Sequence, residues 1–193
     1  MSPLLTAALA YAAKGWRVFP VYEVVAREGD EQGWRCACAE GEACSRPGKH
    51  PRTATGLTEA SADRATVEAW WARWPGASIG VATGSGSGLT VVDADSSGGK
   101  PGLVNLTALA AAAGGGLPRV PQVATGGGGL HLYFLFDERL RTGVDVIGRA
   151  IDVRSEGGYV IAPPSRHVSG GAYAWRGGGA DAPLGTLPDW LVA

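Results

Sequence analysis

The sequence of 193 residues has little charge and little cysteine. Charged residues make up 18% of it, and 17 basic residues almost balance 18 acidic ones, giving a formal net charge of −1. This balance gives no global electrostatic signal for nucleic acid, although it leaves room for a local basic groove. The three cysteines fall in one short segment. Because an odd number cannot all pair within one chain, a disulfide framework is not expected.

Long apolar runs are also missing. No run approaches the ~20 residues that a membrane span requires. The first residues, "MSPLLTAALAYAAKGW", have an apolar part of signal-peptide length, but no Lys or Arg precedes it. We therefore expect an N-terminal helix rather than a leader, no membrane partner and a cytoplasmic location.

Hydrophobic residues form 45% of the chain, which is enough for a folded core, and glycine is abundant, with 31 residues. We predict a single domain over residues 1–193, because no repeat or linker divides the chain. Residues 27–56 are polar, rich in glycine and contain the cysteines, and they show no clear hydrophobic periodicity. This segment is expected to be a loop insertion.

The expected secondary structure follows from hydrophobic periodicity and turn residues. Helices are predicted over 4–14, 63–74 (with Ser61 as N-cap) and 103–113. Strands are predicted over 17–22, 78–84, 89–95, 121–125, 130–136, 150–155, 159–165 and 173–177, with a helical turn at 187–191. The strands flanking 126–129, and those flanking 156–158, are expected to form hairpins or to lie side by side. This order is typical of an α+β domain on a mixed sheet rather than a doubly wound parallel one.

The stretch "GLTVVDADSSGG" leads an apolar strand directly into Asp93 and Asp95. Residues i and i+2 of a strand share one face, so the two carboxylates are expected side by side. Like charges at that spacing repel each other and resist desolvation. A divalent cation between them is the simplest compensating charge.

Two further apolar strands are interrupted by polar residues. His131 lies in "LHLYFLF", and Asp152 and Arg154 occupy positions i and i+2 in "AIDVRS". Taken singly, these are more often a buried histidine and an ordinary ion pair. One site shared with Asp93 and Asp95 explains all three interruptions, because failures of local patterning tend to mark functional sites.

Three carboxylates can bridge two hard cations of the kind used in phosphoryl transfer. In such a site, His131 and Arg154 could hold the oxygens of a triphosphate. A two-metal nuclease or phosphohydrolase would use the same carboxylates but has less need of a triphosphate clamp. Both interpretations remain open from these residues.

The segment "CACAEGEACSRPGKH" supplies a second candidate site. Three thiolates and an imidazole, from Cys36, Cys38, Cys44 and His50, complete a tetrahedral zinc shell. The Cys-x-Cys spacing is tighter than that of a standard finger, and the alternative is three buried or incidental thiols. We predict structural Zn²⁺, because nothing else in this loop would order it.

Five motifs, in this order, resemble those of one family. They are "CACAEGEACSRPGKHP", "GLTVVDADS", "TGGGGLHLYF", "IDVRSEGGYVIAPPSRH" and "LPDWL". Over nearly its whole length the chain resembles the bifunctional DNA primase/polymerase (prim–pol) domain of the archaeo-eukaryotic primase superfamily, as found in plasmid and phage replication proteins. The resemblance implies an α+β archaeo-eukaryotic primase catalytic fold with an RRM-like mixed sheet, a second small α/β lobe and a zinc-binding stem.

By motif, the resemblance implies that Asp93, Asp95 and Asp152 are catalytic carboxylates that bind two Mg²⁺ or Mn²⁺ ions. It assigns His131 to the phosphates of the incoming nucleotide. It also places Ser165 and His167, in "PPSRH", near that nucleotide.

One departure concerns the second motif, which often reads Ser-x-His and here has Gly129 at the Ser position. A hydroxyl donor is missing there. Phosphate binding is therefore expected to rest more on the backbone amides of Gly126–Gly129, including those of Gly128 and Gly129.

The expected function is template-directed nucleotidyl transfer: DNA primase and DNA polymerase activity that makes or extends primers on single-stranded DNA from NTPs or dNTPs. A helicase would act in trans or in a part outside this chain. The alternatives are the nuclease or phosphohydrolase, and a non-catalytic single-stranded DNA binding module. We expect the phosphates of the template to contact the basic residues near the cysteines, which are Arg35, Arg46, Lys49 and Arg52. The alternative is that these four residues are solvated loop charges.

Overall fold

The structure is a computed structural model that describes residues 1–192, without the side chains of residues 31 and 32. The chain forms two compact units, each with its own sheet. Unit 1 comprises Met1–Ala82 and Tyr159–Ala174, and unit 2 comprises Thr83–Gly158 and Trp175–Ala193. Within the described residues, no helix is long and apolar enough to cross a membrane.

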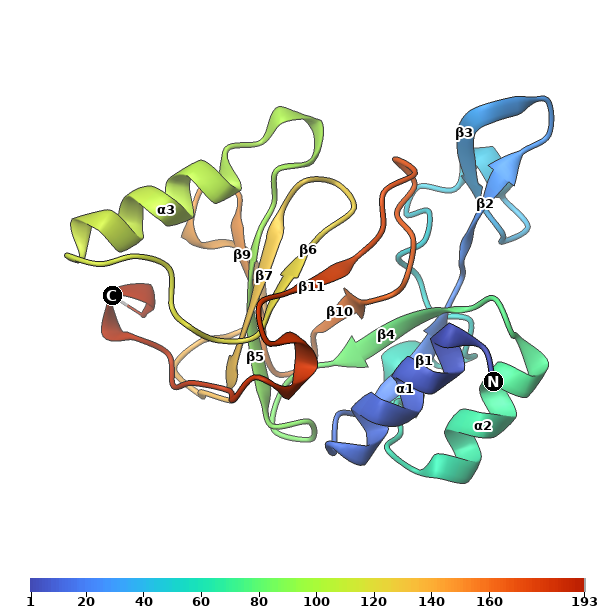
Figure 1. The fold of residues 1–193 in the computed structure, drawn as a ribbon, viewed down its shortest axis with the longest axis horizontal. Coiled ribbons are helices and arrows are strands. Elements are labelled where there is room, and N and C mark those ends of the chain that lie inside the picture. Colours follow the sequence, from blue (N-terminus) through green and yellow to red (C-terminus); the bar gives the residue numbers. More distant parts are fainter. Residues whose placement is uncertain (193) are drawn as a thin grey trace. The chain divides into compact units, whose positions relative to one another are not determined.

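Unit 1 is built on a three-stranded antiparallel sheet in the order β1-β4-β10, beside which helices α1 and α2 pack together (Figure 1). Its helices are α1 (Pro3–Ala13) and α2 (Arg64–Arg73), with 3₁₀ turns η1 (Gly41–Ala43) and η2 (Gly56–Glu59). Its strands are β1 (Val18–Val21), β2 (Val24–Arg27), β3 (Asp30–Cys36), β4 (Ser78–Ala82) and β10 (Tyr159–Ala162). Every residue of β1 and β4 is buried, so this sheet forms the core of the unit.

The cap of α2 differs from the sequence prediction. The N-cap is Asp63, whose carboxylate accepts a hydrogen bond from Thr66 N–H at 2.8 Å. The predicted cap, Ser61, instead accepts from the Asp63 N–H through its hydroxyl. Asp63 takes the cap because its side chain reaches an amide in the first turn, which would otherwise lack a partner.

An antiparallel hairpin of β2 and β3 extends away from the three-stranded sheet of unit 1 (Figure 1). The prediction of a loop over 27–56 is wrong for β3. The hairpin escaped detection because β3 carries many polar residues and the ladder has a register shift at Ala26/Arg27, which hides the alternation of a strand.

Unit 2 contains a six-stranded sheet in the order β11-β6-β7-β5-β9-β8. Its strands are β5 (Leu89–Ala94), β6 (Gln122–Ala124), β7 (Leu130–Leu135), β8 (Gly143–Gly148), β9 (Ile151–Arg154) and β11 (Ala174–Arg176), the last beginning at the unit boundary. Its helices are α3 (Gly102–Ala112) and the 3₁₀ turns η3 (Ser97–Gly99), η4 (Gly179–Asp181) and η5 (Asp189–Leu191). The four ladders from β6 to β8 are antiparallel.

One face of the six-stranded sheet forms the core of unit 2, with α3 packed on β5 and β9. Val92, Leu132 and Val153 point to this face from three neighbouring strands. The alternate residues of the same strands therefore lie on the opposite face.

The two predicted hairpins have different outcomes. β6 and β7 pair as an antiparallel hairpin around 126–129, as predicted. β9 and β10 do not pair: β9 lies in the six-stranded sheet between β5 and β8, whereas β10 pairs with β4 in unit 1. Between them Glu156 accepts hydrogen bonds from the backbone and hydroxyl of Ser85, so this turn is tied to another loop.

Candidate functional site

A row of polar residues crosses three neighbouring strands of unit 2. Asp93 on β5 is paired in register with His131 on β7 and with Asp152 on β9. Directly opposed residues of antiparallel strands lie on the same face. The structure therefore brings these three predicted residues together on the face that lies opposite the apolar core.

His131 and Asp93 make an electrostatic contact, with 3.5 Å between His131 Nε2 and Asp93 Oδ1. The histidine side chain is only 6% exposed and the aspartate 20%. This distance is at the outer limit of a hydrogen bond. The two side chains are therefore neighbours on this face of the sheet.

Asp152 is held through both carboxylate oxygens. Oδ2 accepts a hydrogen bond from Arg154 Nη2 at 2.7 Å, which confirms that the two side chains share a face. Oδ1 accepts from the backbone N–H of Asp145 at 3.0 Å. Asp145 has a left-handed backbone with φ of 56°, and its own carboxylate accepts from Ala150 N–H. The irregular part of β8, where the ladder with β9 shifts register, therefore helps to fix the orientation of Asp152.

Asp95 follows the last residue of β5, and its negative charge is stabilised by residues of the turn that comes after it. Its Oδ1 accepts from the backbone and hydroxyl of Ser97, and its Oδ2 accepts from Lys100 Nζ at 2.7 Å. Partial burial alone would raise the pKa of Asp95, but the hydrogen bonds from Lys100 and Ser97 outweigh it and lower the pKa to about 2. Lys100 was not predicted from the sequence, because it stands on a loop without periodicity.

A cavity of about 360 Å³ lies beside these carboxylates within unit 2. The charged residues that line it are Asp95, Lys100, Asp145, Arg149 and Asp152. It therefore presents acidic groups suited to a cation together with two cations suited to an anion.

The carboxylates fit the metal expected from the sequence by their chemistry. Carboxylate oxygens are the ligands that Mg²⁺ and Mn²⁺ prefer. In this structure Asp95 and Asp152 are each satisfied by protein donors. Among the described residues, only the cysteine–histidine group gathers three or more potential metal ligands within 4.8 Å of one another. A metal at the carboxylates would therefore compete with these donors for the carboxylate oxygens.

The glycine turn between β6 and β7 explains the departure at position 129. A Cβ on Gly129 would lie 2.5 Å from the carbonyl oxygen of Ala94, so a serine does not fit this backbone. The same Cβ would lie 3.1 Å from Thr125 Oγ1, which accepts from the Gly129 N–H. The Gly128 N–H donates to the Thr125 carbonyl. Both amides are used within the turn, and their binding of phosphate stays a prediction.

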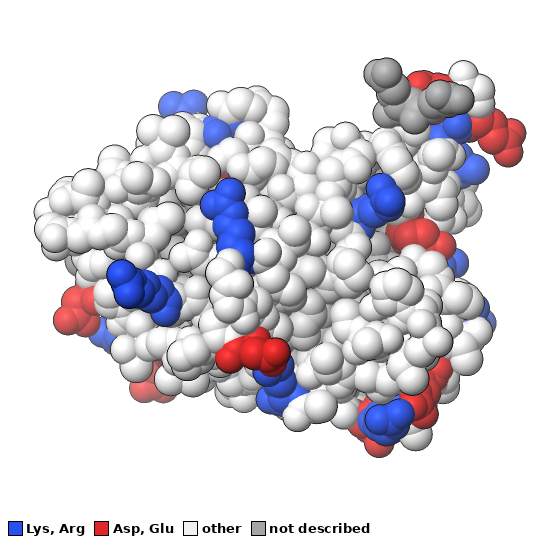
Figure 2. All heavy atoms as spheres, in the orientation of Figure 1, with Lys and Arg blue, Asp and Glu red and all other residues white. Residues whose placement is uncertain are grey.

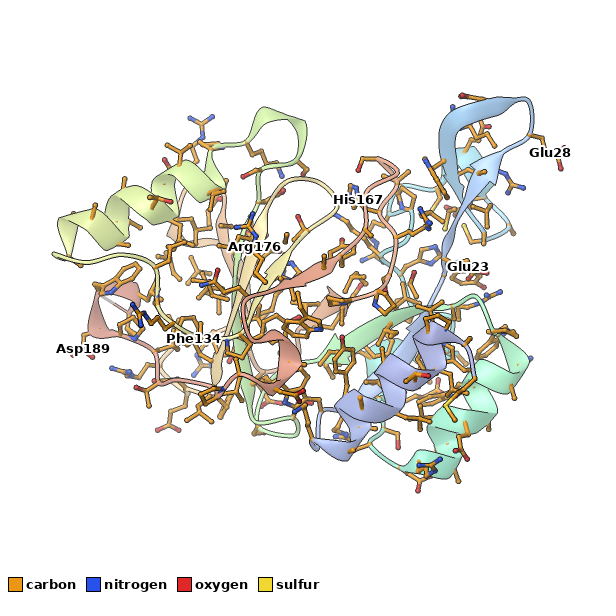
Figure 3. The ribbon with its side chains drawn as sticks, viewed as in Figure 1. Glu23, Glu28, Phe134, His167, Arg176 and Asp189 are labelled. Carbon is orange, nitrogen blue, oxygen red and sulfur yellow. The ribbon has the colours of Figure 1, made fainter. Side chains whose placement is uncertain are left out.

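Ser165 and His167 belong to unit 1, whereas the carboxylates belong to unit 2. The Ser165 hydroxyl is buried and accepts from the backbone N–H of Ile79 at 2.9 Å. His167 lies on the segment between β10 and β11, where its Nδ1 accepts from Ser169 N–H (Figure 3). These bonds order the segment, and a role near the nucleotide stays a prediction for both residues.

The cysteine–histidine group in unit 1 forms a compact cluster. Cys36 ends β3, Cys44 follows η1, and both are buried. His50 Nε2 lies 3.3 Å from Cys36 Sγ and 3.5 Å from Cys44 Sγ. All four ligand atoms, that of Cys38 included, lie within 4.8 Å of one another. Tetrahedral zinc places such ligand atoms about 3.5–3.8 Å apart, so the cluster could hold Zn²⁺.

The electrostatics of the cluster suit a metal that displaces protons. Burial raises the pKa of the Cys44 thiol to about 11. Burial, together with Arg46, lowers the pKa of His50 and favours the neutral imidazole that binds metals. A bound cation would therefore stabilise the thiolate form of Cys44 at neutral pH.

Aromatic and charged neighbours support the histidine of the cluster. Tyr22 stacks on His50 at 4.7 Å, and the Arg52 guanidinium lies 4.7 Å from the Tyr22 ring. Arg52 is also paired with Glu23, which lies at the base of the hairpin, whereas Glu28 at its tip points outward (Figure 3). Arg52 thus serves packing within unit 1.

The fold and the two clusters define a class: a two-unit α+β protein with an acidic site on antiparallel strands and a Cys₃His cluster that begins at the end of a hairpin. The family model for the bifunctional DNA primase/polymerase N-terminal domain matches residues 8–190, and the chain belongs to this family. Membership indicates a primase/polymerase enzyme of the nucleotidyltransferase class that acts on DNA and nucleotides. A comparison with curated proteins finds no match.

Proposed function

We propose that this domain makes or extends primers on single-stranded DNA by template-directed, two-metal phosphoryl transfer. The observation that carries the proposal is the row of His131, Asp93 and Asp152 in register on three neighbouring strands. Asp95, directly after β5, completes the proposed set of three metal-binding carboxylates. Mg²⁺ or Mn²⁺ bound there would lower the pKa of the attacking hydroxyl and stabilise the leaving pyrophosphate.

The residues of the chain supply binding and orientation. Arg154 holds Asp152 on the sheet, so that the carboxylate faces the site in one orientation. His131, next to Asp93, would bind a phosphate oxygen of the incoming NTP or dNTP. The Gly128–Gly129 turn would let the phosphates approach the backbone closely, because it carries no side chain there. Ser165 and His167, in unit 1, are proposed to contribute to nucleotide binding.

The Cys₃His cluster is proposed to hold a structural Zn²⁺. Four protein ligands leave no open position for a water, which is typical of a structural rather than a catalytic zinc site. The zinc would join the end of β3 to the segment before η2 and so stabilise the hairpin as a stem.

The template path is not marked by charge on the visible surface. On the face shown in Figure 2, uncharged residues predominate and the Lys and Arg side chains stand apart from one another. This agrees with the balanced composition of the chain. We propose that single-stranded DNA contacts Arg35, Arg46 and Lys49 around the zinc cluster, and that unwinding is supplied by a helicase in trans or in a further domain.

The experiment is synthesis from labelled nucleotides on single-stranded DNA, with and without a primer, in Mg²⁺ or Mn²⁺. Labelled oligomers without a primer would support a primase, and extension of a supplied primer alone would support a polymerase that needs a partner to start. Shortening of the template would instead indicate a nuclease at the same carboxylates. DNA binding without any change in length would indicate a binding module.

A further inference from the structure

Lys100 occupies a position that the proposed reaction does not explain. It stands between η3 and α3, and its Nζ contacts Asp95 Oδ2 at 2.7 Å. It lines the same cavity as Asp145 and Asp152 and lies in the field of both carboxylates. A single ammonium group thus stands at the acidic side of the site, where a metal ion is expected.

The two cations that compensate the carboxylates are held differently. Arg154 is part of β9 and its side chain is 28% exposed, whereas the Lys100 side chain is 58% exposed. Lys100 follows Gly98 and Gly99, and a Cβ at either glycine would meet nothing within 4 Å. A lysine on such an open turn can leave its partner by rotating its own side chain. Lys100 is therefore the more exposed of the two cations, and it stands on a loop rather than on a strand.

We propose that Lys100 is an exchangeable counter-ion: it neutralises Asp95 before a divalent cation binds, gives up this carboxylate to the metal, and then contacts the phosphates of the nucleotide. This inference rests on the proposed function, because it takes the carboxylates as the metal site. The released ammonium stays beside the cavity, which Arg149 also lines. Two cations there would face the negative charge of a triphosphate.

The exposure of the Lys100–Asp95 ion pair indicates how strongly Lys100 competes with a metal ion for Asp95. A partly exposed ion pair is weak, so its loss changes metal affinity by only about two- to fivefold. A metal with two positive charges can therefore displace Lys100 readily. Without metal, the lysine keeps Asp95 from repelling the neighbouring carboxylates.

The test measures Mn²⁺ binding by electron paramagnetic resonance on the full chain with its zinc cluster loaded. Lys100→Met is compared with wild type and with Lys14→Met, which removes the same charge from the end of α1 in unit 1. Asp95→Asn identifies the site, because it should weaken Mn²⁺ binding. Equilibrium binding of a dNTP in Mg²⁺ is measured on the same proteins.

Lys100→Met is expected to bind Mn²⁺ about two- to fivefold more tightly than Lys14→Met, and to bind the dNTP more weakly. Equal Mn²⁺ affinity in the two lysine variants would overturn the exchange while leaving the proposed function intact. Tighter Mn²⁺ binding with unchanged dNTP binding would overturn the transfer of Lys100 to the phosphates. If wild type binds no Mn²⁺ that depends on Asp95, the proposed metal site itself fails, and this inference fails with it.

Discussion

Asp93 and Asp152 are direct cross-strand neighbours on β5 and β9. Two carboxylates opposed in this way destabilise a sheet, and this pair lies on a largely buried face. Each carboxylate has a basic neighbour: Asp93 contacts His131, and Asp152 is paired with Arg154. The arrangement keeps two acidic groups close together at a cost in stability, which is the expected signature of a site kept for function.

The hydrogen bonds to Asp95 make stability depend on pH in the acid range. Its pKa is about 2 in the folded protein against an ordinary value of 3.8. Because the folded pKa is depressed, the stabilisation is fully present above pH 4 and is lost as pH falls toward 2. We expect the loss of unfolding free energy in acid to be smaller in Asp95→Asn than in wild type, by on the order of 1–2 kcal/mol after allowance for solvent screening.

The measurement is urea unfolding of wild type and Asp95→Asn at several pH values from 6 down to 2.5. The difference in unfolding free energy between the two proteins should shrink as the pH falls. A difference that stays constant over this range would show that Asp95 carries no depressed pKa.

The turn at position 129 should reject any side chain. Because a Cβ there would lie 2.5 Å from the Ala94 carbonyl, we expect Gly129→Ala to lower the free energy of unfolding by about 1–3 kcal/mol. Gly115→Ala is the matched control, since its Cβ would meet nothing within 4 Å. Denaturant unfolding of both variants checks this. Equal stabilities would mean that the turn can relax and that a serine could be accommodated.

Removal of the metal from the Cys₃His cluster should loosen the hairpin. Purified protein is expected to contain about one equivalent of zinc, because four ligand atoms lie within 4.8 Å. Cys44→Ala should lose the zinc and unfold at a lower temperature, and amide exchange should increase in β2 and β3. Less than half an equivalent of zinc in the wild type, with unchanged stability in Cys44→Ala, would contradict the assignment.

Much of the acidic site could be predicted from the sequence, because strand alternation assigns faces. Asp93, His131 and Asp152 each interrupt an apolar strand, and the ladders place them in register on one face. Lys100 could not be predicted in the same way. It reaches Asp95 through a turn whose shape depends on glycines with positive φ and not on any period.

The sequence predicted most strands of the fold but not all of their partners. β9 and β10 flank a short glycine turn and look like a hairpin, yet they pair in different sheets. Turn residues indicate where the chain bends. Which strand a given strand pairs with is decided by packing elsewhere in the fold. The β2–β3 hairpin was missed because β3 is mostly polar and the ladder shifts register. β8 was missed because it is a short segment between two glycines whose apolar residues are not buried.

The most direct test of the central claim is primer extension by Asp152→Asn beside Asp189→Asn. Asp152 lies in the proposed metal site with its side chain 12% exposed, whereas Asp189 is 98% exposed near the C-terminus (Figure 3). Both substitutions remove one negative charge from unit 2. We predict that Asp152→Asn loses at least about a hundredfold in extension rate while remaining folded, and that Asp189→Asn keeps the wild-type rate. Undiminished extension by folded Asp152→Asn would contradict the assignment of this acidic row as the polymerase site.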